Sequence, residues 1–302
     1  KADFRTNPSG GADNEAAGMA RLGHLRGDRG CESGSTSTCL YDDGSNTFTT
    51  RSLRVRGSRL GDIVHSAPVF VGEPELNWPD TPPFPHASGT TYSDFKLSHA
   101  NRDGMVYVGG NDGLLHGFSA QDGSEVLAYA PNALFSSYTT KGYHYLADPA
   151  YSHRYYVDLT PAIADAHVKT SSTGSVTWHT VLVGALRGGG RGLFATGFSE
   201  NSGAAASTVM WEFTSADDPN LGLTFSKPSI VPLEGPSGSI RWAAIVGNGY
   251  NADGGTGSAQ LFILFLEAGL DGVWNLGSYY LRIDTGAGDI DPTNINNTSC
   301  TA

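Results

Sequence analysis

Residues 105–131 read MVYVGGNDGLLHGFSAQDGSEVLAYAP, and this stretch decides the fold. It contains three short apolar runs, at 105–109, 114–120 and 125–130, separated by the turns Asn-Asp-Gly and Gln-Asp-Gly. Asp-Gly pairs supply the positive φ angle that a tight hairpin turn requires. The stretch therefore predicts three consecutive strands joined by tight turns.

The same pattern occurs three times along the chain. Each occurrence begins with an extended lead-in segment that contains Pro68, Pro161 or Pro228. A proline is tolerated at the start of a strand because the missing backbone donor costs little there. An extended lead-in followed by strands and Gly-rich turns is typical of a four-stranded propeller blade. The strand-turn-strand parts lie at 105–120, 181–198 and 244–266.

The lead-ins lie farther apart than the roughly 40 to 50 residues of regular propeller blades, so the blades carry insertions. We expect one insertion at 73–101, rich in proline, and another at 132–158, rich in Tyr and Phe. A β-sandwich or irregular all-β domain is the alternative, and the threefold recurrence favours a propeller. The length leaves room for an incomplete all-β propeller over residues 58–302.

Residues 1–57 are expected to form a linker or lead-in segment with a short helix, at 14–25, and a hairpin closed by a disulfide. Cys31 and Cys39 bracket small and polar residues, and a disulfide there would indicate an oxidising compartment. Two free thiols are the alternative. Cys300 has no partner left and the chain begins at Lys1, so we expect a fragment or a processed form.

Composition excludes several classes of function. The net charge of −11 argues against nucleic acid and anionic membranes as partners, because both require clustered positive charge. No apolar run reaches the roughly 18 residues of a membrane-spanning helix. With 40 glycines and only 16% charged residues, the chain is expected to be a turn-rich β protein.

Several motifs also occur in the order found in one bacterial family. The segments LRGDR (25–29) and RLGDIVHSAPV (59–69) resemble the opening of the C-terminal domain of the PilC/PilY family of type IV pilus proteins. The stretch at 105–131 resembles the repeat of quinoprotein-like propellers. The later matching segments are VDLTP (157–161), VLVG (181–184), GGGRG (188–192), GNGYN (247–251) and IDTG (283–286).

This resemblance implies a non-catalytic adhesin and pilus biogenesis factor built on a modified, quinoprotein-like β-propeller. It implies a secreted protein at the cell surface or pilus tip, associated with the outer membrane. The implied partners are minor pilins, the pilus tip complex and a host or abiotic surface, without membrane insertion. The family's calcium loop lies downstream of the segment matched by 283–286, so Ca²⁺ is expected for the parent protein without an identified site here. No organic cofactor is expected.

Two local motifs are candidate sites with ordinary alternatives. Asp42, Asp43 and Asn46 place oxygen ligands close together, as a calcium loop does, but they lack EF-hand spacing, and a solvated turn is the alternative. Arg26-Gly27-Asp28 spells the integrin-binding tripeptide, which offers a guanidinium and a carboxylate together. The alternative is a structural turn with its aspartate paired to a neighbouring arginine.

Aromatic residues of the insertions are candidate binding anchors. Tyr and Trp give a large contact area at low entropic cost, so Trp78, Tyr143 and Tyr145 are expected to contact partners. The alternative is that they cover blade edges.

Two other functions are weighed against the adhesin. A quinone-dependent periplasmic oxidoreductase uses the same propeller type, but no Cys-Cys pair occurs and the tryptophans are scattered. No catalytic residues are assigned, and no enzyme is expected. A structural subunit of an extracellular filament, joined through open propeller edges, is the second alternative.

Overall fold

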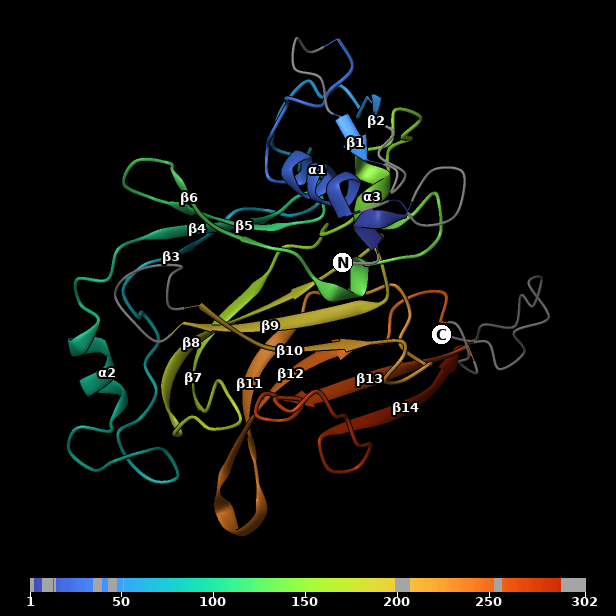
Figure 1. The fold of residues 1–302 in the computed structure, drawn as a ribbon. Helices are drawn as coiled ribbons and strands as arrows, with labels where there is room; N and C mark the ends of the chain where they lie inside the picture. The colour runs from blue at the N-terminus through green and yellow to red at the C-terminus, as the bar shows by residue number, and fades with distance from the viewer. Residues whose placement is uncertain are drawn as a thin grey trace.

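Three four-stranded antiparallel sheets follow one another along the chain in the computed structural model (Figure 1). The strands of each sheet pair in sequence order, which is the arrangement of a propeller blade. The predicted all-β, incomplete propeller is therefore confirmed, and we call the sheets blades 1, 2 and 3. The structure describes residues 3–6, 13, 15–34, 40–42, 48–50, 52–198, 207–252 and 257–288.

Blade 1 contains the stretch that predicted the fold. The glycines of its two Asp-Gly turns, Gly113 and Gly123, have φ angles of 90° and 75°, a conformation that other residues rarely adopt. The predicted strands of this stretch agree with the observed ones to within a residue or two. The strands of blade 1 are β3 (Val69–Val71), β4 (Met105–Gly109), β5 (Leu115–Ser119) and β6 (Glu125–Tyr129).

Blade 2 is covered on both faces. Val181 and Val183 of its second strand pack in the cluster shared with blade 3, whereas Leu182 between them packs in the cluster shared with blade 1. Side chains of a strand alternate between the faces, so a strand buried on both reads as a continuous apolar run. The strands of blade 2 are β7 (Ala162–Val168), β8 (Thr177–Ala185), β9 (Gly192–Phe198) and β10 (Ser207–Thr214).

Blade 3 ends with a strand that the sequence pattern did not indicate. Its last strand contains the IDTG segment, and Ile283 pairs with Leu261 of the preceding strand. The first three strands were predicted from the lead-in and the apolar runs. The strands of blade 3 are β11 (Ser229–Glu234), β12 (Ile240–Gly247), β13 (Ser258–Phe265) and β14 (Tyr280–Gly288).

The first insertion, residues 73–101, links blade 1 to the other two blades, and we call it the strap. It contains α2 (Tyr92–Ser98), whose capping box joins Thr91 and Asp94. The Trp78 indole Nε1 donates to the backbone oxygen of Asp165 in β7 at 3.0 Å, and its ring packs edge-on against Trp242 of β12 at 5.0 Å. The strap thus crosses from blade 1 over blade 2 to blade 3.

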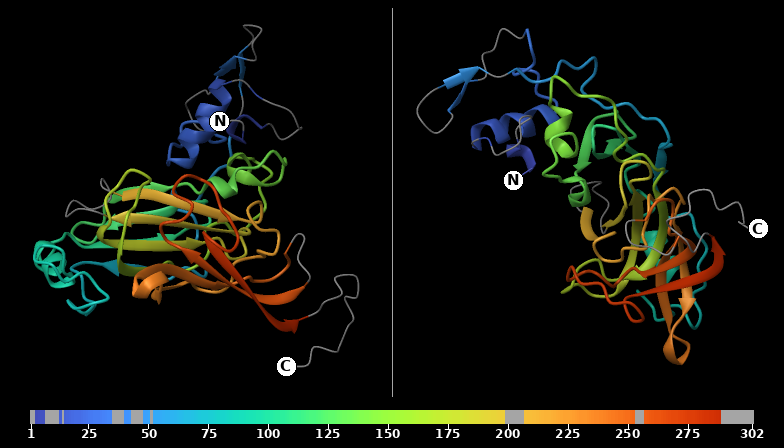
Figure 2. Two further views of the ribbon diagram at one scale, coloured as in Figure 1. Left: turned by 90° about the horizontal axis from the view of Figure 1, so that it is seen from below. Right: turned by 90° about the vertical axis from the view of Figure 1, so that its right-hand side faces the viewer.

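The N-terminal segment packs on blade 1 and the second insertion (Figure 2). It contains η1 (Asp3–Arg5), α1 (Glu15–Leu25), β1 (Leu40–Asp42) and β2 (Phe48–Thr50), and the second insertion contains η2 (Asn132–Leu134) and α3 (Gly142–Leu146). The helix predicted at 14–25 corresponds to α1.

Phe4 and Leu25 of the N-terminal segment belong to the core cluster of blade 1. The Asp3 carboxylate accepts hydrogen bonds from the Ser136 and Tyr143 backbone nitrogens of the second insertion. A short 3-10 helix, η4 (Pro236–Gly238), joins β11 to β12. Of the described helices, none is long and apolar enough to cross a membrane.

Candidate functional site

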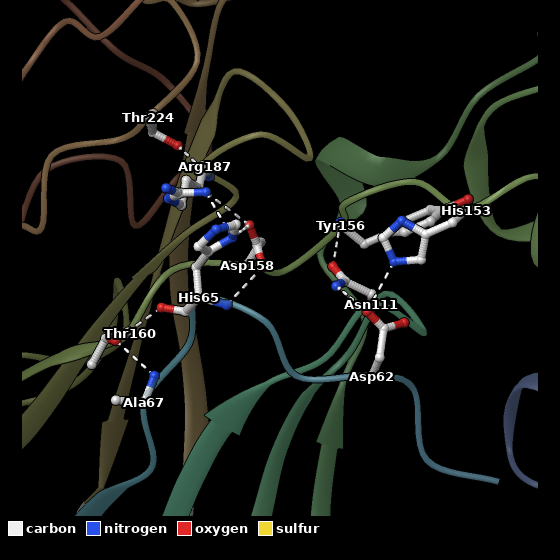
Figure 3. Close-up of polar contacts among 10 residues, drawn as sticks. All are labelled: Asp62, His65, Ala67, Asn111, His153, Tyr156, Asp158, Thr160, Arg187 and Thr224. Carbon is white, nitrogen blue, oxygen red and sulfur yellow. Dashed lines mark hydrogen bonds and ion pairs between the residues drawn. The ribbon is translucent and has the colours of Figure 1, made fainter. Parts of the chain in front are cut away.

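The Pro-containing lead-ins and the Gly-rich turns of the sequence meet at one edge of the blades. Because neighbouring strands are antiparallel, the lead-in to the first strand lies beside the turn between the second and third. We call this edge, formed by the lead-ins and these turns, the lead-in edge (Figure 3). Its described parts are the lead-ins 60–68, 156–161 and 222–228 and the turns 110–114, 186–191 and 248–252.

Asn111 joins blade 1 to blade 2. Its side-chain Nδ2 donates to Asp62 Oδ2 at 2.9 Å, and its Oδ1 accepts from the Tyr156 backbone nitrogen at 3.0 Å. The His153 Nε2 atom lies 2.8 Å from the same Asp62 oxygen. Burial opposes ionisation of Asp62, but the hydrogen bonds from Asn111 and His153 hold its pKa below the ordinary value.

Asp158 is the most buried charged group of this edge, with 1% of its surface exposed. Its Oδ2 lies 2.7 Å from His65 Nδ1 and accepts from Arg187 Nη1 at 3.2 Å, while Oδ1 accepts from the His65 backbone nitrogen at 3.2 Å. Figure 3 shows the three side chains converging from three separate segments. A buried carboxylate is stable only when such partners replace its water.

Arg187 extends these contacts to blade 3. Its backbone nitrogen donates to the Thr224 hydroxyl oxygen at 3.0 Å, and its guanidinium carbon lies 4.8 Å from the centre of the Phe225 ring. The φ angle of Arg187 is 52°, a left-handed conformation that is uncommon for residues other than glycine. Two ordered contacts on blade 3 therefore hold a strained residue of blade 2.

The glycines of this edge allow close approach of the backbones. A Cβ atom added at Gly189 would lie closer than 3.0 Å to the Tyr156 carbonyl oxygen, and one added at Gly61 would overlap the Asp112 backbone nitrogen. Only glycine fits at either position without movement of the main chain. The GGGRG and RLGD segments are thus explained by packing between lead-ins and turns.

The arrangement is suited to holding blades together. The hydroxyl groups beside His65 accept from backbone nitrogens: Ser66 Oγ from Gly109 at 2.8 Å, and Thr160 Oγ1 from Ala67 at 2.7 Å. Among the described residues, no three or more His, Cys, Asp or Glu side chains form a group able to hold a metal ion.

Comparison with known proteins decides the family. The family described as the PilY1 β-propeller domain matches residues 60–276, which include blades 1 and 2 and the first three strands of blade 3. The chain belongs to the PilY1 β-propeller family.

Curated proteins of the PilY1 family are more than a third identical to this chain over the aligned residues. The type IV pilus biogenesis factor PilY1 of Pseudomonas aeruginosa strain PAK is 36% identical over 259 residues, which cover 84% of this chain and 19% of the relative. A PilY1 homolog of Xylella fastidiosa strain Temecula1 is 36% identical over 251 residues, which cover 82% of this chain and 15% of the relative. The chain therefore spans less than a fifth of the length of these relatives.

One solved structure of the family is similar to this chain. The crystal structure of the Pseudomonas aeruginosa PilY1 C-terminal domain has 34% sequence identity and a TM-score of 0.48. The similarity covers 66% of this chain and 35% of that one.

The Arg-Gly-Asp tripeptide forms the end of helix α1. The Gly27 nitrogen donates to the His24 oxygen, the Asp28 nitrogen donates to the Gly23 oxygen, and Gly27 has a φ of 96°. These bonds define a Schellman cap, which requires a left-handed residue, usually glycine, after the helix. Arg26 and Asp28 are exposed, and the Asp28 carboxylate accepts from the Gly30 nitrogen at 2.8 Å. Integrin recognition by this tripeptide stays a prediction.

The predicted aromatic anchors have different positions. Tyr143 and Tyr145 are 1% and 5% exposed, and the Tyr143 hydroxyl donates to the Pro131 backbone oxygen. Buried rings cannot contact an external surface, so the expectation that these two are exposed anchors is wrong. Trp78 is half-buried, with its ring stacked on Phe84 at 5.6 Å, and it holds the strap on the blades.

Other predicted positions lie partly outside the described residues. Asp43, Asn46 and Cys39 are outside them, and the structure describes only the backbone of Asp42. Cys31 is disulfide-bonded, and its pairing with Cys39 stays a prediction.

His65, Asp158 and Arg187 were missed as site residues, although His65 and Asp158 lie within motifs that marked the family resemblance and Arg187 directly precedes the GGGRG motif. Asp158 and its partner His65 are 93 positions apart in the sequence. The available signal was a His, an Asp and an Arg in three separate Gly- or Pro-containing segments, each beside a strand. That pattern predicts where strands end, but it does not predict which of these segments contact one another in the fold.

Proposed function

We propose that this chain is part of a type IV pilus biogenesis factor in which the propeller is a non-catalytic scaffold for binding. Membership of the PilY1 family, with relatives named type IV pilus biogenesis factors, carries this proposal. The protein then acts as an adhesin at the cell surface or pilus tip. Its partners are minor pilins, the tip complex and a host or abiotic surface.

The geometry of the lead-in edge supports a scaffold. A His–Asp pair also occurs in enzymes, where it activates a neighbouring nucleophile. In this chain the paired His65 Nδ1 also lies 2.7 Å from Arg187 Nη1, and the nearby hydroxyls of Ser66 and Thr160 accept from backbone nitrogens. Thr160, His65 and Arg187 are engaged in joining blades, and Ser66 ties the lead-in of blade 1 to β4, as expected of a rigid support for binding loops.

Two chemical features belong to the same proposal. Calcium binding is proposed for the longer protein, without a site assigned among the described residues. A disulfide between Cys31 and Cys39, formed on secretion, is proposed for the N-terminal segment.

Deletion of residues 60–276 in the source bacterium tests this function. We expect far fewer surface pili by electron microscopy, with pilin still present in the cells, and reduced attachment to surfaces. The control is Tyr138→Ser, a change at a 69% exposed residue outside the blades, which should leave pili at normal numbers. Normal pili and attachment after the deletion would refute the proposal. A quinone absorbance band with dye-linked turnover in the purified protein would refute the proposal that the propeller is non-catalytic.

A further inference from the structure

Five half-exposed side chains form a continuous row across the lead-in edge. His153 and Tyr155 pack edge-to-face with ring centroids 5.4 Å apart, and Tyr155 and His65 lie at the same separation. Arg187 Nη1 lies 2.7 Å from His65 Nδ1, and the guanidinium of Arg187 covers the Phe225 ring at 4.8 Å. We call these five residues the aromatic–cation row.

The row is exposed, although it is firmly held. Tyr155 and Phe225 are 40% and 43% exposed, and the His153, His65 and Arg187 side chains are 50%, 36% and 24% exposed. Its members come from the lead-ins of blades 1 and 3, from the end of the second insertion just before the lead-in of blade 2, and from the β8–β9 turn. A contact surface that is already ordered loses little side-chain entropy when a partner binds.

The charges that face outward on this edge are mainly positive, although the whole chain has a net charge of −11. Asp158, which neutralises Arg187, is buried beneath the row, and Asp62 is paired with His153 at one end. Arg154 and Lys227 are exposed and are close neighbours of the row in sequence. The Arg154 guanidinium carbon lies 5.6 Å from the centre of the Tyr145 ring.

We propose that the aromatic–cation row binds an acidic, extended segment of a protein partner in which carboxylates alternate with apolar side chains. Carboxylates pair with Arg187, Arg154 and Lys227, while apolar side chains pack on the Tyr155 and Phe225 rings. Arginine and aromatic residues dominate the binding energy of protein interfaces, and complementary charge sets orientation and association rate. This inference rests on the proposed function, because it names the surface by which the scaffold takes a partner.

Peptide binding to the purified 302-residue chain tests the inference. The probe is a fluorescein-labelled peptide of alternating Glu and Phe, and the comparison probe has Lys in place of Glu. We expect saturable binding of the Glu peptide by fluorescence polarisation, at least tenfold weaker binding of the Lys peptide, and weaker binding of the Glu peptide at high salt.

The double variant Phe225→Ser/Lys227→Glu removes one end of the row without touching Asp158. It should weaken binding of the Glu peptide by tenfold or more while the chain stays folded by circular dichroism. The matched control is Tyr138→Ser/Lys141→Glu, which alters another exposed aromatic–lysine pair, 5.2 Å apart, on the second insertion. The control should bind like the original chain.

Equal binding of the two peptides, an unchanged affinity in the Phe225/Lys227 variant, or an equal loss in the control overturns the inference. Binding of the carboxylated polysaccharide polygalacturonate in place of the Glu peptide also overturns it. If peptide binding fails while deletion of residues 60–276 abolishes pili, only this inference is wrong. If the deletion leaves pili unchanged, the proposed function is wrong whatever the peptide result.

Discussion

At the scale of the residue, Asp158 shows how a buried polar group organises this fold. Its carboxylate lies under the surface where the lead-in of blade 1, the lead-in of blade 2 and the turn of blade 2 meet. Moving His65 or Arg187 away would leave the buried carboxylate unpaired, which costs several kcal/mol of folding free energy. This penalty holds both partners in place. The same contacts orient the exposed faces of both partners.

Gly189 is expected to tolerate no side chain. In Gly189→Ala the new Cβ meets the Tyr156 backbone, which is fixed by Asn111, so we expect a loss of about 3 kcal/mol in the free energy of unfolding. Gly57→Ala is the control, since nothing lies within 4 Å of a Cβ there. Urea denaturation measures both variants. Equal stability of the two variants would show that the approach at Gly189 is not tight.

His24 is expected to make the chain less stable in mild acid. Burial, helped by the positive charge of Arg56, lowers the pKa of His24 from 6.5 to about 4. Between these two values the unfolded chain binds a proton that the folded chain does not, so stability is retained above pH 6.5 and declines as the pH falls toward 4. The decline amounts to roughly 3 kcal/mol.

Melting temperatures between pH 7 and pH 4 check this dependence. The His24→Leu variant removes the titrating ring and should flatten the decline, whereas a change at the exposed His86 should not. An equal decline in the original chain and the His24→Leu variant would assign the effect to other groups.

At the scale of the element, most strands could be predicted from the sequence because the signals that mark a strand lie within or next to it. Lead-in prolines, Gly-rich turns and apolar runs mark where a strand begins and ends, and these signals predicted the first three strands of every blade. Strand β14 was missed because most of it is exposed and it lacks an apolar run. The strap was recognised as an insertion, but its course depends on distant tryptophans that no local pattern connects.

Trp78 is expected to anchor the strap. In Trp78→Ala the strap loses the hydrogen bond to Asp165 and the ring contacts with Phe84 and Trp242, which should lower the free energy of unfolding by about 2 to 3 kcal/mol. Limited proteolysis should then cut faster within 73–101. The control Leu97→Ala changes a 78% exposed side chain of the same strap and should not alter the cleavage rate. Unchanged proteolysis of Trp78→Ala would contradict the anchoring role.

For the candidate site too, the sequence predicted the local segments but not the contacts between them. The segments that build the lead-in edge were recognised by their motifs, yet the meeting of His65 with Asp158 follows only from the order of the blades. The predicted anchors Tyr143 and Tyr145 were wrong because an aromatic-rich insertion is equally consistent with a core. Tyr143 is covered in part by Phe4, which stacks on its ring and comes from the distant N-terminal segment.

At the scale of the whole molecule, the three blades form an open propeller with apolar side chains on its two outer faces. Phe70 of blade 1 and Ile283 of blade 3 are 62% and 48% exposed on the faces that point away from blade 2. The described blades are therefore held together at their shared cores, by the strap and by the lead-in edge. We expect these three connections to make them one rigid scaffold.

Hydrogen–deuterium exchange of the original chain and of Asp158→Asn tests this central claim most directly. The substitution keeps the shape of the side chain and removes the charge that His65 and Arg187 share. We expect faster exchange in 60–67, 156–160 and 186–190 together, with the matched control Asp122→Asn, at an exposed turn, unchanged. Exchange that stays as slow as in the original chain, or that rises in only one of these segments, would contradict a lead-in edge that joins the blades.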